Sequence, residues 1–151
     1  MIAALIVGIV TAIHDGDTFS IGKQRIRVFG IDAPELHQQC SPAPGQCSPC
    51  GEAAREALSA MILGKEVRCA DRGRSYDRVV AECIVDGAAI GPAMVAQGQA
   101  VVYRQFLKKA DKPAYLGAEA GAKRAGEGLW AMTWVPPADW RKHRARLECE
   151  R

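Results

Sequence analysis

The segment Thr18–Ile31 reads TFSIGKQRIRVFGI, two runs rich in β-branched and aromatic residues on either side of Gly22-Lys23. Such runs are typical of β-strands, and the Gly-Lys pair between them indicates a tight turn. We therefore predict strands over Thr18–Ile21 and Gln24–Ile31. The preceding run Ile6–His14 has the same character, so the first third of the chain is expected to form a three-stranded meander.

Helices are predicted between and after further strands. A loop rich in Ser, Pro, Gly and Cys covers residues 38–51, and apolar residues at helical spacing then predict a helix over Glu52–Leu63. The later predicted elements are a strand over Lys65–Ala70, a strand over Arg78–Val85, a short helix with Pro92 in its first turn that ends at Gly98, and a helix over Lys112–Arg124. This order favours a mainly β fold of the α+β class over a parallel α/β sheet. We expect a small, closed, five-stranded barrel capped by about three helices.

The length and charge of the chain indicate one domain that tolerates a polyanionic partner. A chain of 151 residues suits a single core, which we assign to residues 1–133, with a basic tail over 134–151 that is not a separate domain. The net charge of +3 is much milder than that of a tight nucleic-acid binder. A monomer is expected.

The cellular compartment is suggested by the N-terminus and the cysteines. The apolar run Ile2–Val7 lacks a basic flank, so a first strand is favoured over an uncleaved signal peptide. No apolar stretch is long enough to cross a bilayer, so a membrane partner is not expected. Six cysteines are many for a cytosolic protein of this size. We expect a secreted or periplasmic location, with a cytoplasmic one as the alternative because no clear signal peptide is present.

Disulfides are the preferred interpretation of the cysteines. Cys69 and Cys83 lie in two predicted strands, where a cross-strand bridge is geometrically reasonable. Cys40 and Cys50 could staple the loop before the first helix. A zinc site at Cys47-Ser48-Pro49-Cys50 is the rival, but a lone C-x-x-C without a second pair is weak. The sequence alone leaves the connectivity open, including the roles of Cys47 and Cys149.

Two acidic residues near the predicted strands are candidate metal ligands. Asp17 lies in Asp15-Gly16-Asp17-Thr18, and Asp32 follows the third strand. A hard cation such as calcium or magnesium prefers carboxylate oxygens, and with two carboxylates it would keep several waters. An isolated Asp-Gly-Asp is usually only a turn, so this hypothesis depends on the second acidic cluster around Asp32.

That second cluster adds a candidate base and two candidate phosphate ligands. Glu35 follows a proline three residues after Asp32, near enough to accept a proton from a water of the cation. Arg27 and Arg78 supply planar, permanent charges that match phosphate oxygens in pairs. Side chains alternate along a strand, so Arg27 and Asp32 share a pocket only if the chain bends between them. Gly30 is the expected place for that bend.

The combined motifs resemble the thermonuclease family, the relatives of staphylococcal nuclease. The matching stretches lie in the family's order between residues 9 and 130. They are Asp-Gly-Asp-Thr at 15–18, Arg27-Val28-Phe29-Gly30-Ile31-Asp32-Ala33-Pro34-Glu35, Tyr76-Asp77-Arg78-Val79-Val80-Ala81, Gly98-Gln99-Ala100 and Gly128-Leu129-Trp130. The resemblance implies an OB-type Greek-key barrel and calcium-dependent cleavage of DNA and RNA to 3′-phosphate products, with magnesium less favoured.

The resemblance also assigns roles residue by residue. It implies Asp17, Asp32 and the main-chain carbonyl of Ala33 as calcium ligands. Glu35 becomes the general base, and Arg27 and Arg78 become the arginines that bind the phosphate.

Departures from the family pattern keep an alternative open. The family usually has Gly where this chain has Asp77, whose charge competes with phosphate for Arg78. The residues that frame the nucleotide are matched only in part, by Tyr76, Tyr103 and Arg104. The alternative is a module of the same fold that binds nucleic acid or protein without cutting.

The basic run 141–146 near the C-terminus has two interpretations. Together with Trp134 and Trp140 it could extend contact with a nucleic-acid backbone. Runs of this kind are more often solvated tails, and we expect the solvated form here.

Overall fold

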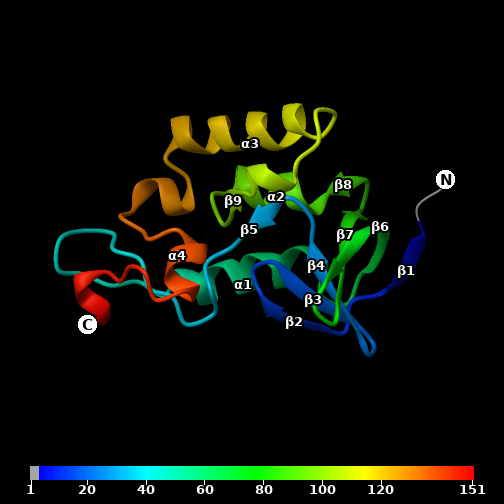
Figure 1. Ribbon diagram of the computed structural model, residues 1–151, viewed down its shortest axis with the longest axis horizontal. Helices are drawn as coiled ribbons and strands as arrows, with labels where there is room; N and C mark the ends of the chain where they lie inside the picture. The colour runs from blue at the N-terminus through cyan, green and yellow to red at the C-terminus, as the bar shows by residue number, and fades with distance from the viewer. Residues whose placement is uncertain (1–3) are drawn as a thin grey trace.

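From Ala12 onward, the predicted meander forms one end of a curled, mainly antiparallel sheet in the computed structural model, which describes residues 4–151 (Figure 1). The sheet contains β1 (Leu5–Ile9), β2 (Ala12–Asp15), β3 (Thr18–Ile21), β4 (Gln24–Val28), β6 (Glu66–Ser75) and β7 (Arg78–Val85) in the order β1-β6-β7-β4-β3-β2, and β8 (Ala88–Ala89) pairs with β7. The short strands β5 (Ile31–Asp32) and β9 (Val101–Val102) form a separate pair. The α+β class is confirmed, and the arrangement is consistent with an OB-like fold.

The sheet curls without closing its hydrogen-bonded ladder, which corrects the expected closed barrel. Its two edges, β1 and β2, were predicted as one strand over Ile6–His14. At Val10 the backbone N–H donates to the carbonyl of Lys65, whereas at Thr11 it donates to the carbonyl of Ser20. The run therefore changes hydrogen-bond partners between these residues and splits into two strands.

The predicted bend at Gly30 is confirmed, and it divides the expected strand Gln24–Ile31 into β4 and β5. Gly30 has a φ of 81°, a conformation that side-chain-bearing residues rarely adopt. A Cβ at this position would lie 2.7 Å from Cε1 of Tyr115. The bend therefore requires glycine for both its conformation and its close packing.

Four α-helices are present among the described residues, one more than expected. They are α1 (Cys50–Ile62), α2 (Ile90–Ala96), α3 (Lys112–Ala125) and α4 (Pro137–Arg141). Three match predicted helices within a few residues, whereas α4 lies in the region interpreted as a solvated tail. Leu58 of α1 and Met94 of α2 are fully buried in one core cluster with Phe19 and Ile26 of the sheet, so the amphipathic pattern of the helices explains their packing.

The polar stretch 71–77 was expected to connect two strands, but β6 continues through it as far as Ser75. Its register against β7 shifts between Asp71 and Arg74, which is the signature of a bulge. A turn at Tyr76 then leads into β7. The alternation of apolar residues that identifies a half-buried strand is missing here, so the extension was not predicted.

All six cysteines lie in the described residues and form three disulfides. The bridges are Cys40–Cys50, Cys69–Cys83 and Cys47–Cys149. The first two match the predicted candidates, and the third ties the C-terminus to the loop before α1. Because Cys47 and Cys50 belong to different disulfides, their C-x-x-C pair is not available to zinc.

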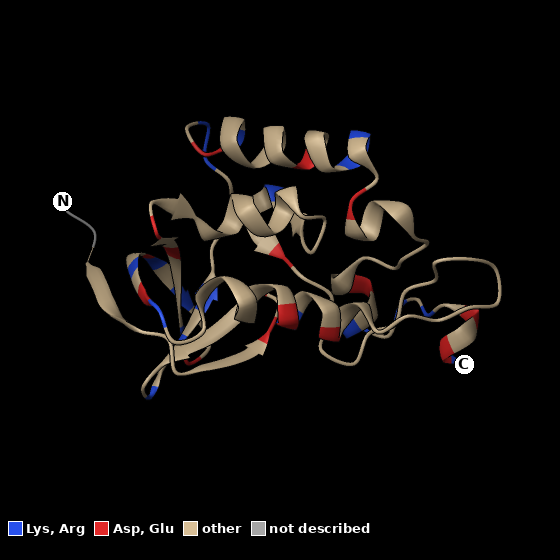
Figure 2. Cartoon of the chain, turned by 180° about the vertical axis from the view of Figure 1, so that it is seen from behind, with Lys and Arg blue, Asp and Glu red and all other residues tan. Residues whose placement is uncertain are grey.

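Charged side chains are spread over the sheet, the helices and the loops when the chain is seen from behind (Figure 2). Among residues 4–151, no helix combines the length and apolarity needed to cross a bilayer.

Candidate active site

Asp17 lies in a tight, hydrogen-bonded turn between β2 and β3. Its backbone N–H donates to Oδ1 of Asp15 at 3.0 Å, an Asx-type contact that shapes the turn. Its own Oδ2 accepts the backbone N–H of Ala33 at 2.8 Å, and its Oδ1 accepts the hydroxyl of Thr18 at 3.2 Å. Asp17 is only 6% exposed. Its carboxylate is therefore fixed by one backbone donor and one side-chain hydroxyl.

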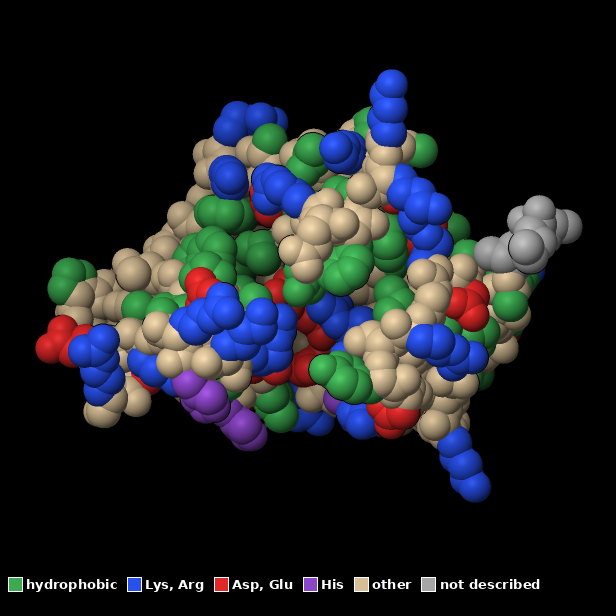
Figure 3. Space-filling view, viewed as in Figure 1, with side chains coloured by type: hydrophobic (Ala, Val, Ile, Leu, Met, Phe, Trp, Pro, Cys, Tyr) green, Lys and Arg blue, Asp and Glu red, His purple; other side chains and the backbone are tan. Residues whose placement is uncertain are grey.

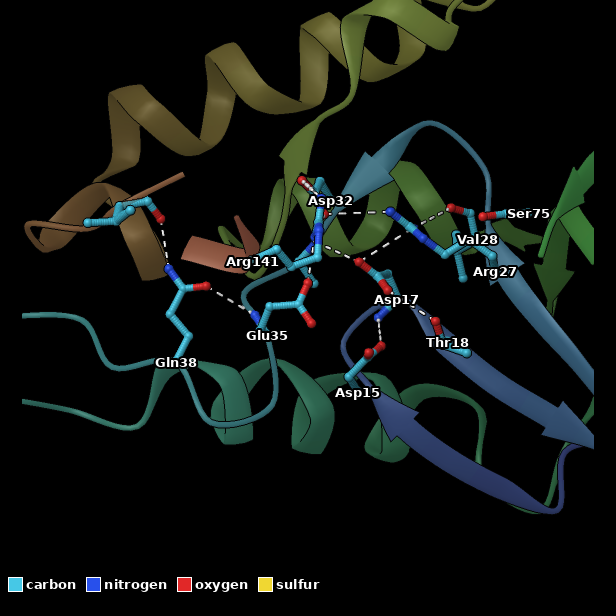
Figure 4. Close-up of polar contacts among 12 residues, drawn as sticks. Asp15, Asp17, Thr18, Arg27, Val28, Asp32, Glu35, Gln38, Ser75 and Arg141 are labelled. Carbon is cyan, nitrogen blue, oxygen red and sulfur yellow. Dashed lines mark hydrogen bonds and ion pairs between the residues drawn. The ribbon is translucent and has the colours of Figure 1, made fainter. Parts of the chain in front are cut away.

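Arg27 of β4 lies between the two predicted metal ligands (Figure 4). Its Nη1 is 3.4 Å from Oδ2 of Asp17, and its Nη2 is 3.6 Å from Oδ1 of Asp32. The bend at Gly30 allows this, because Asp32 belongs to β5 and no longer follows the alternation of β4. The guanidinium of Arg27 therefore neutralises part of the charge of both carboxylates.

Glu35 projects towards the same cluster from the loop between β5 and α1 (Figure 4). Gln38 holds this loop in place: its Oε1 accepts the N–H of Glu35 at 3.1 Å, and its Nε2 donates to the carbonyl of Val135 at 2.7 Å. Gly51 lets the start of α1 approach closely, since a Cβ there would lie 1.8 Å from the carbonyl of Glu35. Neither supporting residue was predicted from the sequence, because no motif marks Gln38 or Gly51.

Arg78 reaches the cluster at its edge. Its Nη1 lies 3.5 Å from Oγ1 of Thr18, and its Nη2 donates to Oγ of Ser75 at 2.9 Å. Asp77 is exposed, and within the described residues it forms no ion pair with Arg78. The effect of Asp77 on phosphate binding by Arg78 therefore stays a prediction.

Arg141, at the end of α4, is a member of the cluster that no sequence motif predicted. Its Nη1 and Nη2 lie 3.1 and 3.4 Å from the two carboxylate oxygens of Asp32, and Nη1 also donates to Oε1 of Glu35 (Figure 4). The available signal was Cys149, because a disulfide to the loop that follows Glu35 places the tail near the site. The solvated-tail interpretation is wrong for Arg141, whereas Lys142 and Arg144 are exposed as expected.

The predicted nucleotide-framing residues are not joined to this cluster. Tyr76 is 96% exposed, Tyr103 packs edge-on against Phe106, and Arg104 is paired with the buried Glu119. Among the described residues, none of the three predicted residues forms a hydrogen bond or ion pair with the cluster. Their role in substrate binding stays a prediction.

The carboxylates have an excess of negative charge in a partly dry environment. Burial and then the nearby Asp17 raise the pKa of Asp15 to about 7. Burial likewise raises the pKa of Asp32, although Arg141 and Arg27 act against it. Burial disfavours the charge on Arg141, but its hydrogen bonds to Asp32 and Glu35 outweigh this and raise its pKa. Figure 3 shows acidic side chains in a hollow at the centre of this face, bordered by Lys and Arg.

The donor set fits a hard divalent cation in part. Asp17 and Asp32 both contact Arg27, so their carboxylates face a common space, and oxygen ligands of this kind suit calcium or magnesium. No three His, Cys, Asp or Glu side chains in residues 4–151 are grouped as a ready cage. A cation would therefore need a main-chain oxygen and water in addition. Ala33 is adjacent, with its N–H bonded to Asp17, and the role of its carbonyl stays a prediction.

The fold and this site define an OB-like α+β domain with a carboxylate and arginine cluster at the bend of its sheet. Residues 25–132 match the model of the family described as staphylococcal nuclease homologue. The chain belongs to this family, as its motifs predicted.

Individual relatives agree with this assignment. The chain is 33% identical over 140 residues to an "uncharacterized endonuclease" of Haemophilus influenzae, covering 88% of this chain and 71% of the relative. It is 33% identical over 122 residues to the succinoglycan biosynthesis protein ExoI of Rhizobium meliloti, covering 79% and 62%. It is 34% identical over 143 residues to the "probable endonuclease LCL3" of Paracoccidioides brasiliensis, covering 83% and 41%. The chain thus spans well under two thirds of the fungal relative.

Proposed function

We propose that this protein is a calcium-dependent, sugar-nonspecific endonuclease that hydrolyses the phosphodiester bonds of DNA and RNA, with water as the nucleophile and 3′-phosphate products. The convergence of Asp17, Arg27, Asp32 and Glu35 on one hollow carries this proposal. Names of relatives that include the word endonuclease give it independent support.

Glu35 is the proposed general base. Its side chain is 26% exposed, so water can reach it, and the hydrogen bonds of Gln38 keep its loop in position. A general base must lie within hydrogen-bond reach of the proton that it accepts, and a positioned carboxylate meets that requirement. A divalent cation held by Asp17 and Asp32 would supply positive charge to the phosphate and make bound water more acidic.

The arginines are proposed to bind the phosphate and stabilise its charge in the transition state. Arg27 is half-buried beside the carboxylates, and Arg78 is held by Ser75 at the edge of the cluster. A guanidinium can donate two parallel hydrogen bonds to phosphate oxygens, and such preorganised donors are most effective where water is scarce. The two arginines would therefore contact the substrate from the sheet side of the hollow.

Cleavage assays test the proposal directly. We expect supercoiled plasmid DNA and single-stranded RNA to be degraded in calcium, to be spared in excess chelator, and to be cleaved less efficiently in magnesium. New DNA ends that a polymerase extends only after phosphatase treatment would identify 3′-phosphates, because extension requires a free 3′-hydroxyl. Asp32→Asn keeps the shape of the side chain but removes one charge from the proposed cation site, so this variant should require more calcium for the same cleavage rate. Undiminished cleavage in chelator would overturn the cation dependence.

The alternative, a module that binds nucleic acid without cutting, is favoured by one observation. In this structure Arg141 contacts both the proposed metal ligand Asp32 and the proposed base Glu35. If that contact persists when substrate binds, the chemistry is blocked. DNA binding in calcium with no cleavage over hours would establish this alternative.

We also propose that the protein works as a monomer in an oxidising compartment, secreted or periplasmic. Three disulfides support this proposal, because such bonds persist outside the reducing cytosol. Fractionation of the source cells, with thiol counting on the isolated protein, tests the location. Light scattering of the purified protein tests the oligomeric state.

A further inference from the structure

The residues 134–151, here called the C-terminal segment, are anchored beside the site at several points. The disulfide Cys47–Cys149 ties the segment to the loop before α1. The carbonyl of Val135 accepts a hydrogen bond from Gln38, the residue that also holds the loop of Glu35. Trp140 donates to Glu150 at 2.9 Å. The backbone that carries Arg141 is therefore held next to the carboxylates.

Arg141 differs from the other two arginines in its exposure and its partners. Its side chain is 36% exposed, compared with 13% for Arg27. In the described residues, its side-chain hydrogen bonds go only to Asp32 and Glu35. Arg78, by contrast, is bonded to Ser75 and Thr18, outside the carboxylates. Arg141 is thus the arginine that faces both the carboxylates and the open side of the hollow.

The partners of Arg141 are the groups that the proposed reaction uses. A metal ion bound to Asp32 would displace Arg141 from this carboxylate, because the positive charges of the ion and the guanidinium repel each other at one anionic group. The anchored segment keeps the guanidinium within a side-chain length of the site. The displaced guanidinium keeps its charge and its paired donors, and the substrate phosphate is the anion that arrives at that place.

We propose that Arg141 is a third phosphate-binding residue of the site, supplied by the C-terminal segment, which exchanges Asp32 and Glu35 for the substrate phosphate when a cation binds. This inference rests on the proposed function, because it needs a phosphodiester ligand at the cluster. The planar guanidinium that now spans the two oxygens of Asp32 has the geometry that also matches two phosphate oxygens.

The test measures DNA binding without turnover. In a Glu35→Gln parent loaded with calcium, the affinity for a fluorescein-labelled single-stranded DNA decamer is measured by anisotropy, with and without Arg141→Ala. Loss of a bidentate contact to a charged group should weaken binding by about 10-fold or more. Arg144→Ala removes the same charge from an exposed position nearby and should weaken binding by no more than about 2-fold.

Calcium titration calorimetry without DNA is the second readout. Arg141→Ala should bind calcium as tightly as the parent or more tightly, because a competitor for Asp32 has been removed. Weaker calcium binding would mean that Arg141 only positions the ligands, and it would overturn the proposal. So would decamer binding that is unchanged or tighter in Arg141→Ala, or an equal loss in Arg144→Ala. If Arg141→Ala fails to fold, Arg141→Lys, which keeps the charge but loses the fork, should show a smaller loss in the same direction.

The outcome is separable from that of the proposed function. If the wild-type protein cleaves DNA but decamer binding does not change in Arg141→Ala, only this inference is overturned. If the wild-type protein does not cleave DNA but decamer binding is weaker in Arg141→Ala, the proposed enzymatic activity is overturned and the phosphate-binding role of Arg141 stands.

Discussion

The two sides of the hollow are built in different ways. On the sheet side, Asp17, Arg27 and Asp32 lie within 16 residues of each other in sequence and are held by strand pairing and the bend at Gly30. On the other side, Arg141 lies 109 residues from Asp32 and enters the site with one exposed side chain. The sheet side is therefore a fixed scaffold, and the C-terminal side contributes a contact that can be exchanged.

The difference follows from burial and backbone bonding. Both oxygens of the Asp17 carboxylate are hydrogen-bonded within the sheet side, one of them to the backbone N–H of Ala33, and moving this carboxylate would leave a buried donor unpaired. Arg141 can leave Asp32 and be hydrated at its exposed side. A contact of that kind costs little to break, which suits a residue that changes partners.

The largest expected effect is on catalysis at the boundary between the two sides. Glu35→Gln keeps the shape of the side chain but cannot accept the proton from water, so the cleavage rate should fall by about 10³-fold. Initial rates on plasmid DNA in calcium measure this. Thermal melting serves as the control and should change little, because Glu35 is partly exposed. A rate within a few-fold of wild type would assign the base to another residue.

Release of the C-terminal side is the next largest effect. Cys47→Ser combined with Cys149→Ser opens a loop with a sequence separation of 102, which should lower the free energy of unfolding by about 4 kcal/mol. Denaturant titration measures this loss. Limited proteolysis should then cut within residues 134–151 first.

The matched control for this release is Cys40→Ser with Cys50→Ser, which breaks a bridge with a sequence separation of 10. It should leave the C-terminal segment protected. The cleavage rate of the Cys47→Ser, Cys149→Ser variant should fall no further than that of Arg141→Ala. A larger loss would mean that the segment supports the sheet side as well, and the division proposed above would not hold.

Gly30→Ala disturbs the sheet side at its bend. The new Cβ would meet the ring of Tyr115 at 2.7 Å in a backbone with φ of 81°, which should cost about 3 kcal/mol of stability. Denaturant titration measures the cost. Activity below the melting range should also fall, because Arg27 and Asp32 depend on this bend. Gly87→Ala is the control for the φ penalty alone, since a Cβ there meets nothing within 4 Å.

Sequence patterns predicted the sheet side well because its information is local. The strands around Thr18–Ile31 alternate, Gly30 lies where the geometry demanded a bend, and Asp17 and Asp32 flank those strands. The break at Val10 was missed because it results from a change of hydrogen-bond partner between two distant strands. That event leaves no mark in the apolar pattern.

The C-terminal side could not be predicted in the same way. A helix of five residues such as α4 is too short for helical periodicity to be read. The segment that carries Arg141 is placed by contacts between residues far apart in sequence, among them the disulfide Cys47–Cys149, and cysteine spacing does not determine pairing. The predicted role of Tyr76, Tyr103 and Arg104 rested on the family pattern alone, and no hydrogen bond or ion pair among residues 4–151 joins them to the cluster.

The smallest effect concerns the excess negative charge on the sheet side. The pKa of Asp15 is raised from 3.8 to about 7, so the folded, cation-free protein binds this proton more tightly than the unfolded chain does. Its stability should therefore fall as the pH rises from about 4 to 7 and should level off above that. Asp15→Asn keeps an oxygen that can accept the N–H of Asp17 and removes the charge. At pH 4 or below the variant should match wild type, and at pH 8 it should be more stable by on the order of 2 kcal/mol.

Glu148→Gln, an exposed change on the C-terminal segment, should leave the profile of stability against pH unchanged. If Asp15→Asn shows no pH-dependent gain in stability in the absence of cation, the excess negative charge does not lie on the sheet side. The two sides would then differ in burial and backbone bonding but not in charge.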